Sequence, residues 1–557
     1  MTVICGLKTN HDGTVAVIAD GELVFSYETE KTANNARHAP LDDVDIGAAL
    51  AEHGIGFGDV DVFAIDGWAG GRVVAPTDRL TGTDGWLTVA PYAEAAAGDP
   101  VLAERRAKVV FDGRPIEYLS FTHAAGHVAG SYCASPFAAR GEDALVLAWD
   151  GGMSPRLYLT HHDTAGIDAL GPLFELVGNG YPVLAAHLDP FRRPAVELAR
   201  EDIGDAELEL PGKAMAYAGL GEVDPDLFPG IAEIIPDRAG PATRYSSFRY
   251  ARALVELSAG RGLDSASLIA TYQAYLAERL VAGLTSVLAG LGTPSPNLVF
   301  TGGCALNIGW NSALRASGLF AQVWVPPFPN DAGSALGTAA AAAMALERRA
   351  VLRWDVYRGQ PLRPGRLEPS WVGRPCSPDR LAALLHDTGE PVVVLAGRAE
   401  LGPRALGNRS ILCPPTDAAA KDRLNRMKGR EWYRPVAPVC LEDRAPDVFD
   451  PGTPDPYMLF THRVRPNWQA RIPAVVHVDG TARLQTVSAA QNPVLAEVLA
   501  GYERRSGIPV LCNTSANLRG RGFFPDLATA MRWGQASYLW SDGTLYENPA
   551  LRFGAEG

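Results

Sequence analysis

The feature that most constrains the fold is a strand followed by a glycine-containing turn, which recurs three times along the chain. In the first copy, residues 2–8 are apolar and rich in β-forming residues. The polar turn 10–13, Asn-His-Asp-Gly, separates them from a second apolar run at 14–18, and an Asp-Gly turn then leads into a third at 22–27. This pattern predicts three consecutive antiparallel strands.

The second and third copies repeat the strand and its turn. Residues 144–149 are apolar and lead into an Asp-Gly-Gly turn at 150–152, and residues 297–301 lead into Gly302 and Gly303. Backbone amides in such turns can cradle phosphates, and an aspartate there can hold a metal ion or a water. A single Asp-Gly turn is equally well explained as an ordinary hairpin. Three such turns, separated by helical segments, predict a duplicated α/β nucleotide-binding domain of the actin-like ATPase type.

Two histidines lie four residues apart in the stretch 121–127, Phe-Thr-His-Ala-Ala-Gly-His, which opens a segment of small residues expected to be helical. Residues four apart on a helix share one face. Neutral imidazoles so placed can bind one metal ion and leave positions open for acidic ligands or substrate. The alternative is a pair of ordinary histidines, one capping and one packed. Asp331 lies at a later strand-to-helix corner, where it would either cap the helix or complete a metal site.

Arginine-bearing turns characterise the last third of the chain. They lie at 402–410, 428–434 and 481–483, and the segment 510–517 adds a strand that ends in Asn-Thr-Ser. Guanidinium groups together with small polar side chains form a good oxyanion pocket. Any single arginine is as well explained as a surface ion-pair partner. As a set, in a protein of formal net charge -13, they favour a phosphate or adenylate site.

The length of the chain predicts more than one domain. At 557 residues, with 47% hydrophobic and 20% charged residues, it can bury more than one large core. Residues 348–378 are rich in proline, glycine and tryptophan and lack clear periodicity, so they are expected to form a linker. The predicted domains are therefore 1–347 and 379–557.

Composition argues against several classes of partner. The net charge of -13, without a basic tract, argues against nucleic-acid binding. The first residues predict a strand and not a signal peptide, and the alanine-rich runs fall short of a membrane span. Seven scattered cysteines without a Cys-x-x-Cys pair suit a reducing cytoplasm, the expected location. The sequence does not predict the oligomeric state.

Taken in order, these motifs resemble the O-carbamoyltransferase family of natural-product biosynthesis, which includes nodulation and aminoglycoside carbamoyltransferases. The resemblance covers essentially the whole chain, and its most specific motif is Gly-Pro-Arg-Ala-Leu-Gly-Asn-Arg-Ser at 402–410. The 3-hydroxymethylcephem carbamoyltransferases are the branch that it suggests, because they share the character of 330–337, 354–357, 402–410 and 477–483.

The resemblance implies two active sites. A C-terminal α/β domain like the threonylcarbamoyl-adenylate synthases would make carbamoyl adenylate from carbamoyl phosphate and ATP, with Mg(II) bound to the ATP. An N-terminal actin-like domain like the tRNA-threonylcarbamoyl transferase subunit would then move the carbamoyl group to a hydroxyl of a small molecule and release AMP. Such a labile intermediate favours two sites in one polypeptide.

The resemblance also implies roles for individual residues. A divalent metal, expected to be Fe(II), would be bound by His123, His127, Asp150 and Asp331. Carbamoyl phosphate and the adenylating phosphate would be held by Arg404, Lys428, Arg434, Arg483 and Ser515, of which the first three are expected to be catalytic. The other expected substrate- or cofactor-binding residues are Asp12, Gly151, Gly152, Gly302, Gly303, Asn307 and Asn513.

His11 resembles the family histidine near the acceptor, where a base must take the proton of the attacking hydroxyl. The alternative is a turn histidine bonded to local backbone. Lys8-Thr9-Asn10 and Gly13-Thr14 depart from many relatives at this corner. The acceptor is therefore open between a hydroxymethylcephem, a sugar hydroxyl and a polyketide alcohol.

Two other functions compete with this interpretation. A carbamoyl or threonylcarbamoyl transferase acting on tRNA would need a basic surface, which the net charge of -13 disfavours. A nucleotide-dependent scaffold that kept an actin-like core would need neither the His/Asp set nor the Arg/Lys set.

Overall fold

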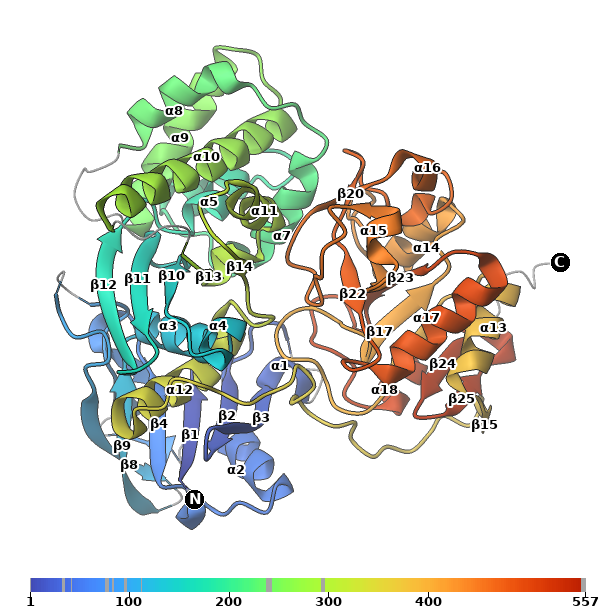
Figure 1. Cartoon of the computed structure of the whole chain (residues 1–557), viewed down its shortest axis with the longest axis horizontal. Coiled ribbons are helices and arrows are strands. Elements are labelled where there is room, and N and C mark those ends of the chain that lie inside the picture. The colour runs from blue at the N-terminus through green and yellow to red at the C-terminus, as the bar shows by residue number, and fades with distance from the viewer. Residues whose placement is uncertain are drawn as a thin grey trace. The chain divides into compact units, whose positions relative to one another are not determined.

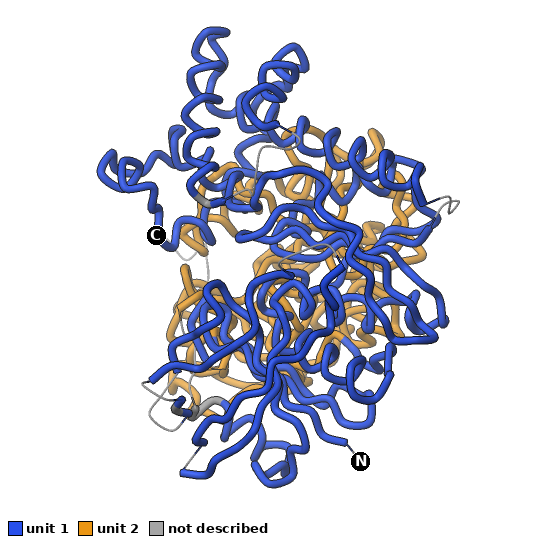
Figure 2. The backbone as a smooth tube through the Cα atoms, turned by 90° about the vertical axis from the view of Figure 1, so that its left-hand side faces the viewer, with its two compact units in different colours: residues 1–29, 38–355 blue, residues 30–37, 356–557 orange. Residues whose placement is uncertain are grey.

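The computed structural model of the chain describes residues 2–32, 36–41, 43–75, 80–82, 85–94, 98–111, 113–236, 243–291 and 296–551. It divides into two compact units (Figure 2). Unit 1 comprises Met1–Thr29 and His38–Asp355, and unit 2 comprises Glu30–Arg37 and Val356–Gly557. Of the segment expected to be a linker, residues 348–355 belong to unit 1 and residues 356–378 to unit 2.

The first sheet of unit 1 contains the predicted N-terminal strands. β1 pairs antiparallel with β2, and β2 with β3, whereas β4 lies parallel to β1 and β9 parallel to β4. The order across the sheet is β3 (Glu22–Glu28), β2 (Thr14–Ala19), β1 (Val3–Lys8), β4 (Val62–Asp66), β9 (Arg114–Phe121), β8 (Arg105–Phe111) and β6 (Leu80–Thr81).

The second sheet repeats the first five strands of this pattern. β10 pairs antiparallel with β11, and β11 with β12, whereas β13 lies parallel to β10 and β14 parallel to β13. The order is β12 (Gly166–Pro172), β11 (Arg156–His161), β10 (Ala144–Ala148), β13 (Leu298–Thr301) and β14 (Val323–Trp324). The repeated order and directions are those of a duplicated actin-like domain, as predicted.

Each of the two sheets is followed by a helix that packs on the other sheet. α3 (His123–Cys133) follows β9 of the first sheet and packs on β10 and β13 of the second, whereas α12 (Ser334–Glu347) follows β14 and packs on β1, β2 and β4. The two helices also pack on each other, as Figure 1 shows. A Cβ atom on Gly337 would lie 2.3 Å from the carbonyl oxygen of Gly126, and one on Gly130 would lie 2.6 Å from Cα of Gly337. Glycine therefore permits this close approach.

A helical region is inserted between β12 and β13. Its helix α10 (Ser265–Leu291) is long and apolar enough, by length and composition only, to cross a membrane, with a mean hydropathy of 1.3. A core helix of a soluble protein can have the same length and composition. One face of α10 packs on α7, α8 and α11. The helices are α5 (Gly180–Ala186), α6 (Ala195–Ala199), α7 (Ala206–Ala218), α8 (Phe228–Ile234), α9 (Arg244–Ala259) and α10 (Ser265–Leu291), and α11 (Ile308–Ala316) follows β13.

Unit 2 is built on a mixed sheet with the order β15 (Val372–Pro375), β25 (Thr544–Glu547), β24 (Tyr538–Ser541), β16 (Val392–Leu395), β17 (Arg409–Cys413), β23 (Val510–Ser515), β18 (Ala437–Leu441) and β22 (Gln485–Val487). Its longest helices, α13 (Pro378–Thr388) and α17 (Pro493–Ser506), pack on each other. The predicted fold class, α/β with a duplicated actin-like N-terminal part and a C-terminal α/β part, is confirmed.

The shorter elements complete the two units. In unit 1 they include α2 (Asp43–Glu52), β5 (Arg72–Val74), β7 (Trp86–Thr88) and α4 (Pro136–Ala139). In unit 2 they include α14 (Ala419–Met427), α15 (Ala445–Val448), β19 (Phe449–Asp450), β20 (His462–Val464), α16 (Pro466–Gln469), β21 (Thr481–Ala482) and α18 (Leu527–Trp533). The helix α1 (Thr29–Thr32) begins at the last residue of the first segment of unit 1 and continues into unit 2.

A short segment from early in the sequence is part of unit 2. Lys31 lies in α1, is buried, and its Nζ donates hydrogen bonds to the carbonyl oxygens of Glu400 (3.0 Å) and Gly402 (2.6 Å). The backbone N–H of Arg37 donates to the carbonyl oxygen of Gly520 (3.0 Å). The C-terminal unit is therefore completed by residues 30–37.

Gly337→Ala should destabilise unit 1, because its methyl group would lie 2.3 Å from the Gly126 carbonyl oxygen and would push α3 and α12 apart. Overpacking of this kind costs about 1–3 kcal/mol. Scanning calorimetry should therefore record a lower unfolding temperature. The control is Gly47→Ala in α2, where no atom lies within 4 Å of the new Cβ. An unchanged unfolding temperature in Gly337→Ala would contradict the packing argument.

Candidate functional site

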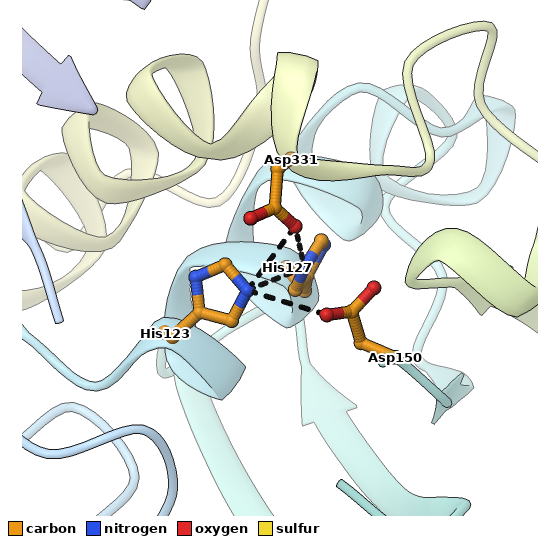
Figure 3. Close-up of side chains that lie close together, drawn as sticks. All are labelled: His123, His127, Asp150 and Asp331. Atoms are coloured by element: carbon orange, nitrogen blue, oxygen red, sulfur yellow. Dashed lines mark hydrogen bonds and ion pairs between the residues drawn. The ribbon is translucent and has the colours of Figure 1, made fainter. Parts of the chain in front are cut away.

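The four residues expected to bind a metal lie together in unit 1 (Figure 3). The Nε2 atoms of His123 and His127 are 3.1 Å apart, and Oδ1 of Asp331 lies 3.3 Å from the first and 3.5 Å from the second. Oδ2 of Asp150 lies 3.7 Å from Nε2 of His123. All four residues are buried, and their ligand atoms lie within 4.8 Å of one another.

The positions of these residues follow from the topology. His123 and His127 are on the first turns of α3, whose N-terminus is capped by Thr122. Asp150 lies two residues after the end of β10, and Asp331 lies on a 3-10 turn between β14 and α12. Because parallel strands end at the same edge of a sheet, turns that are distant in sequence meet there.

Asp66, the last residue of β4, orients one of the histidines. Its Oδ2 lies 2.7 Å from Nδ1 of His123, so Nε2 is the ring nitrogen that faces His127 and Asp331. A carboxylate on the second nitrogen is the usual partner of a metal-bound imidazole. Asp66 was not predicted as a site residue, although the sequence shows it at the end of an apolar, strand-like run at 62–66.

Lys8, the last residue of β1, is a second unpredicted member of the site. Its buried Nζ lies 2.9 Å from Oδ2 of Asp331 and 3.2 Å from Oδ2 of Asp66. Burial opposes its charge, but the carboxylates of Asp331 and Asp66 raise the pKa of Lys8 above its usual value. Oδ2 of Asp331 is thereby paired with a cation, which leaves Oδ1 for a metal.

Lys8 also lies beside a second group of residues whose side chains could bind a metal. His11, Asp12 and Asp331 offer ligand atoms within 4.8 Å of one another. Oδ2 is the Asp331 oxygen nearest His11, at 3.6 Å from Nε2, and it already carries the Lys8 ammonium. A second cation beside this ammonium would be repelled, so the geometry favours the His/Asp cluster of Figure 3 over this group as a metal position.

The charges of the cluster shift the proton equilibria of its members. Burial would raise the pKa of Asp331, but Lys8 and His123 hold it well below its usual value. Burial and Asp331 would raise the pKa of Asp150, but His123 and His127 lower it to about 2. Burial would lower the pKa of His123, but Asp66 and Asp331 raise it well above its usual value. Because metal binding requires neutral imidazoles, a bound dication would displace the second proton of the His123 ring.

Two further contacts hold Asp150 in place. The hydroxyl of Tyr92 donates to its Oδ2 (2.5 Å), and the backbone N–H of Gly303 donates to its Oδ1 (2.6 Å). Gly302 has a φ of 89°, and a Cβ there would lie 2.2 Å from the carbonyl oxygen of Trp149. The glycines after β13 therefore let the backbone approach the turn that carries Asp150.

The remaining predicted residues of unit 1 line the same turns. Gly151 lies against Asn179, since a Cβ there would be 2.8 Å from the amide oxygen, and Gly152 lies against Tyr92. Asn307 caps α11, because its Oδ1 accepts hydrogen bonds from two backbone N–H groups at 3.0 and 3.3 Å. The side-chain oxygen of Asn307 is therefore engaged in capping α11. The expected role of Asn307 in substrate or cofactor binding stays a prediction.

A second cluster lies in unit 2, where the predicted cations gather. Burial and then the neighbouring Arg483 lower the pKa of Arg404 well below its usual value. Burial and then Arg430 lower the pKa of Lys428 in the same way. Arg434 and Arg483 belong to the same cluster, since burial and the charge of Arg434 lower the pKa of Arg483 to about 10. The arginines of three separate turns are therefore close enough for the charge of one to lower the pKa of another.

Lys428 is held by the end of β23. Its Nζ donates to the carbonyl oxygen of Ser515, to Oγ of Ser515 (3.0 Å) and to Oδ1 of Asn517 (2.5 Å). Asn513, two residues earlier on β23, donates from Nδ2 to the carbonyl oxygen of Ala405 (3.0 Å) and to Oε1 of Gln485 (2.7 Å). The predicted residues of β23 and of the turn at 402–410 are therefore neighbours.

Glu400 organises the turn that carries Arg404. One oxygen, Oε1, accepts hydrogen bonds from the backbone N–H groups of Leu406 (2.7 Å), Asn408 (2.7 Å) and Arg409 (3.1 Å). The second arginine of the motif, Arg409, donates instead to backbone carbonyl oxygens, including that of Ala396 at 2.6 Å. Arg409 is therefore structural, and Arg404 is the arginine of this turn that is available to a ligand.

The cluster has the properties of an anion site. Nε of Arg404 and Nε of Arg483 are buried and have no hydrogen-bond partner in the part of the chain that the structure describes. The acidic groups that raise pKa values here are Asp455, which acts on both arginines, and Glu431, which acts on Arg434. Cations therefore outnumber carboxylates, and an oxyanion would satisfy both the charge and the free donors.

Two members of this cluster were not predicted. Arg430 lies within the turn at 428–434, and its pKa falls to about 9 through burial and the charge of Arg434. Arg37 lowers the pKa of Arg404, Lys428 and Arg434, although it is distant from them in sequence. Arg430 could have been identified from its turn, whereas no local signal marks Arg37.

Comparison with protein families identifies the chain. Residues 3–97 and 101–340 match the family model described as Carbamoyltransferase N-terminus, and residues 382–541 match Carbamoyltransferase C-terminus. The chain belongs to the carbamoyltransferase family. It is therefore an enzyme that transfers carbamoyl groups, which confirms the predicted class.

Individual relatives match over nearly the whole chain. Nodulation protein U of Rhizobium tropici is 46% identical over 98% of this chain and 96% of its own. A 3'-hydroxymethylcephem-O-carbamoyltransferase of Amycolatopsis lactamdurans is 34% identical over 94% of each chain. Of these two, the nodulation protein is the more similar. Among solved structures, T. kodakarensis HypF has a TM-score of 0.35 at 13% identity, covering 62% of this chain and 48% of that one.

Asp66→Ala should weaken binding of a divalent metal about 10–100-fold, because His123 would lose the carboxylate 2.7 Å from its Nδ1. The dissociation constant for Fe(II) or Co(II) can be measured by competition with a coloured chelator. The control is His161→Ala, which removes a partly exposed histidine bonded to Asp168. Equal affinity in Asp66→Ala and the wild type would exclude the assigned role.

Arg404→Met should stabilise unit 2 in the absence of anions, because it removes from a group of like charges one cation whose Nε is buried. Relief of such repulsion is expected to contribute about 1 kcal/mol or more, which corresponds to ~2–4 °C in unfolding temperature for a unit of this size.

Added pyrophosphate should raise the unfolding temperature of the wild type and have a smaller effect on Arg404→Met. The control is Arg532→Met, which removes an exposed arginine paired with Glu368 at 3.1 Å. A lower unfolding temperature for Arg404→Met than for Arg532→Met would show that the guanidinium is stabilised within the unit and is not held ready for an anion.

Proposed function

We propose that the protein is an ATP-dependent O-carbamoyltransferase with two reaction centres. Unit 2 would make carbamoyl adenylate from carbamoyl phosphate and MgATP, and unit 1 would transfer the carbamoyl group to a hydroxyl of a small molecule. The observation that carries the proposal is the presence, in one carbamoyltransferase chain, of a buried His/Asp cluster in unit 1 and a cluster of buried and partly buried cations in unit 2.

The chemistry at unit 2 has two steps. Water cleaves the phosphate from carbamoyl phosphate, which leaves carbamate and inorganic phosphate. A carbamate oxygen then attacks the α-phosphorus of ATP, and pyrophosphate leaves with the electron pair of the broken P–O bond. Arg404, Lys428, Arg434 and Arg483 would hold the phosphates and offset the charge that develops, because preorganised donors in a buried site need little reorganisation.

At unit 1, the hydroxyl oxygen of the acceptor attacks the carbamoyl carbon, and the bond to the adenylate oxygen breaks to release AMP. His11 would accept the hydroxyl proton, since its Nε2 faces the His/Asp cluster at 3.6 Å from Oδ2 of Asp331. His123, His127, Asp150 and Asp331 would hold a divalent ion, proposed to be Fe(II), because two imidazoles and two carboxylates suit a first-row metal. Such an ion supplies a Lewis acid that polarises a carbonyl or orients a phosphate.

The acceptor is proposed to be a hydroxyl of a natural product. One relative, 34% identical over 94% of each chain, is named for carbamoylation of a 3'-hydroxymethylcephem, which makes that compound a suitable first acceptor. A sugar hydroxyl, one of the acceptors that the sequence leaves open, should be tested beside it.

The first test measures pyrophosphate release from ATP with and without carbamoyl phosphate. Release that depends on carbamoyl phosphate is expected from the wild type. Arg434→Ala should reduce it about 100-fold or more, because one charged donor is lost from the phosphate site. Arg532→Ala, in an exposed ion pair, is the control and should behave as the wild type.

His127→Ala should give the opposite result, with pyrophosphate release close to that of the wild type and no carbamoylated product. The reason is that His127 lies in unit 1, in the His/Asp cluster, whereas the cations lie in unit 2. If Arg434→Ala and His127→Ala lost the same half-reaction, the proposed division between the units would be wrong. Absence of any pyrophosphate release from the wild type would rule out the adenylate route.

A further inference from the structure

Two residues near the His/Asp cluster have an unusual backbone conformation. Asp12 has a φ of 54° and His38 a φ of 61°, in the left-handed region that residues with a side chain seldom adopt. Such conformations persist where the surroundings impose them, and they are concentrated at functional sites. The two residues are 26 positions apart in sequence, yet their side chains are in direct contact.

The contact is part of an array of three side chains. Oδ1 of Asp12 lies 2.7 Å from Nδ1 of His38, and Oδ2 of Asp12 lies 3.2 Å from Nδ1 of His11. The Asp12 side chain is 8% exposed, against 31% for His11 and 23% for His38. One buried carboxylate therefore lies between two imidazoles, with each oxygen assigned to one ring.

Backbone contacts fix the geometry of the array. The N–H of Gly13 donates to the carbonyl oxygen of Ala39 (2.8 Å), and the N–H of Leu41 donates to that of Thr9 (3.2 Å), so residues 39–41 lie alongside the turn. A Cβ on Gly13 would lie 2.1 Å from the nitrogen of Leu41, which only glycine avoids. His38 is thereby held beside Asp12 by the same contacts that shape the turn.

The array determines which nitrogen of His11 is available. Nδ1 of His11 is beside Asp12, which accepts a hydrogen bond from it, and Nε2 faces the His/Asp cluster. Trp68 contacts the His11 ring edge-to-face at 5.1 Å between centroids, which limits rotation of the ring. A neutral imidazole with its proton on Nδ1 has a free lone pair on Nε2, as a base requires.

We propose that Asp12 and His38 are positioning residues for His11, with Asp12 fixing its tautomer and orientation and His38 fixing Asp12. This inference rests on the proposed function, in which His11 Nε2 takes the acceptor proton while the hydroxyl oxygen bonds to the carbamoyl carbon and AMP leaves. It assigns Asp12 a task other than direct substrate binding, and it assigns a task to His38, which no motif identified.

The test compares His38→Asn with His38→Leu in the full-length protein. An asparagine amide nitrogen can take the place of Nδ1 and keep the hydrogen bond to Asp12, whereas leucine cannot. With 3'-hydroxymethylcephem or a sugar as acceptor, His38→Leu should lower kcat for carbamoyl transfer about 10–100-fold, with little change in the acceptor KM. His38→Asn should recover most of that loss. His161→Leu, which alters a partly exposed histidine bonded to Asp168, is the control.

Metal content and pyrophosphate release should be the same in both His38 variants and the wild type. If the two variants lose the same activity, or if either loses bound metal, the positioning role is overturned. Carbamoyl-phosphate-dependent pyrophosphate release by the wild type distinguishes a failure of the proposed function from a failure of the positioning role of His38. If release is absent, the proposed function fails, whereas if the wild type is active and His38→Leu is unimpaired, only the inference about His38 fails.

A spectroscopic measurement tests the inference without any acceptor. In protein labelled with ¹⁵N-histidine, the ring nitrogen shifts of His11, assigned with His11→Gln, report its tautomer. The wild type and His38→Asn should carry the proton on Nδ1, and His38→Leu should show a mixture of tautomers. An unchanged His11 spectrum in His38→Leu would overturn the proposal.

Discussion

The contact between α3 and α12 determines where the ligands of unit 1 meet. α3 follows the last long strand of the first sheet, β9, and carries both histidines. α12 follows β14 of the second sheet and begins directly after the 3-10 turn Asp331–Gly333. The helices approach so closely that a side chain at Gly337 would collide with the carbonyl oxygen of Gly126. Because these small residues let the two helices begin close together, ligand atoms that follow strands of two different sheets lie within 4.8 Å of one another, close enough to share one metal ion.

The two clusters solve the problem of buried charge in different ways. In unit 1 the carboxylates of Asp66 and Asp331 pair with Lys8, so much of the charge is balanced within the protein. In unit 2 burial and the charges of neighbouring arginines lower the pKa of Arg404 and Lys428, and few carboxylates offset these charges. Holding these cations together therefore costs free energy, and a phosphate bound as proposed would offset it.

The division of the chain into units does not follow its linear order. Residues 30–37 belong to unit 2, where Lys31 anchors the turn that carries Arg404 and Arg37 adds its charge to the cluster. A fragment that began after residue 355 would lack both side chains. The neighbouring His38 belongs to unit 1, where it contacts Asp12. Adjacent residues thus serve different sites.

The sequence by itself determined the fold class and the main residue types of both clusters, because strand–turn periodicity, the spacing of His123 and His127 and the arginine-bearing turns are local patterns. Tertiary structure decided the rest. Asp66 and Lys8 act through partners on a helix, a strand and a turn that are distant in sequence, and Arg37 and His38 also act through distant partners. Such roles depend on strand order and on contacts between distant segments, which no local spacing encodes.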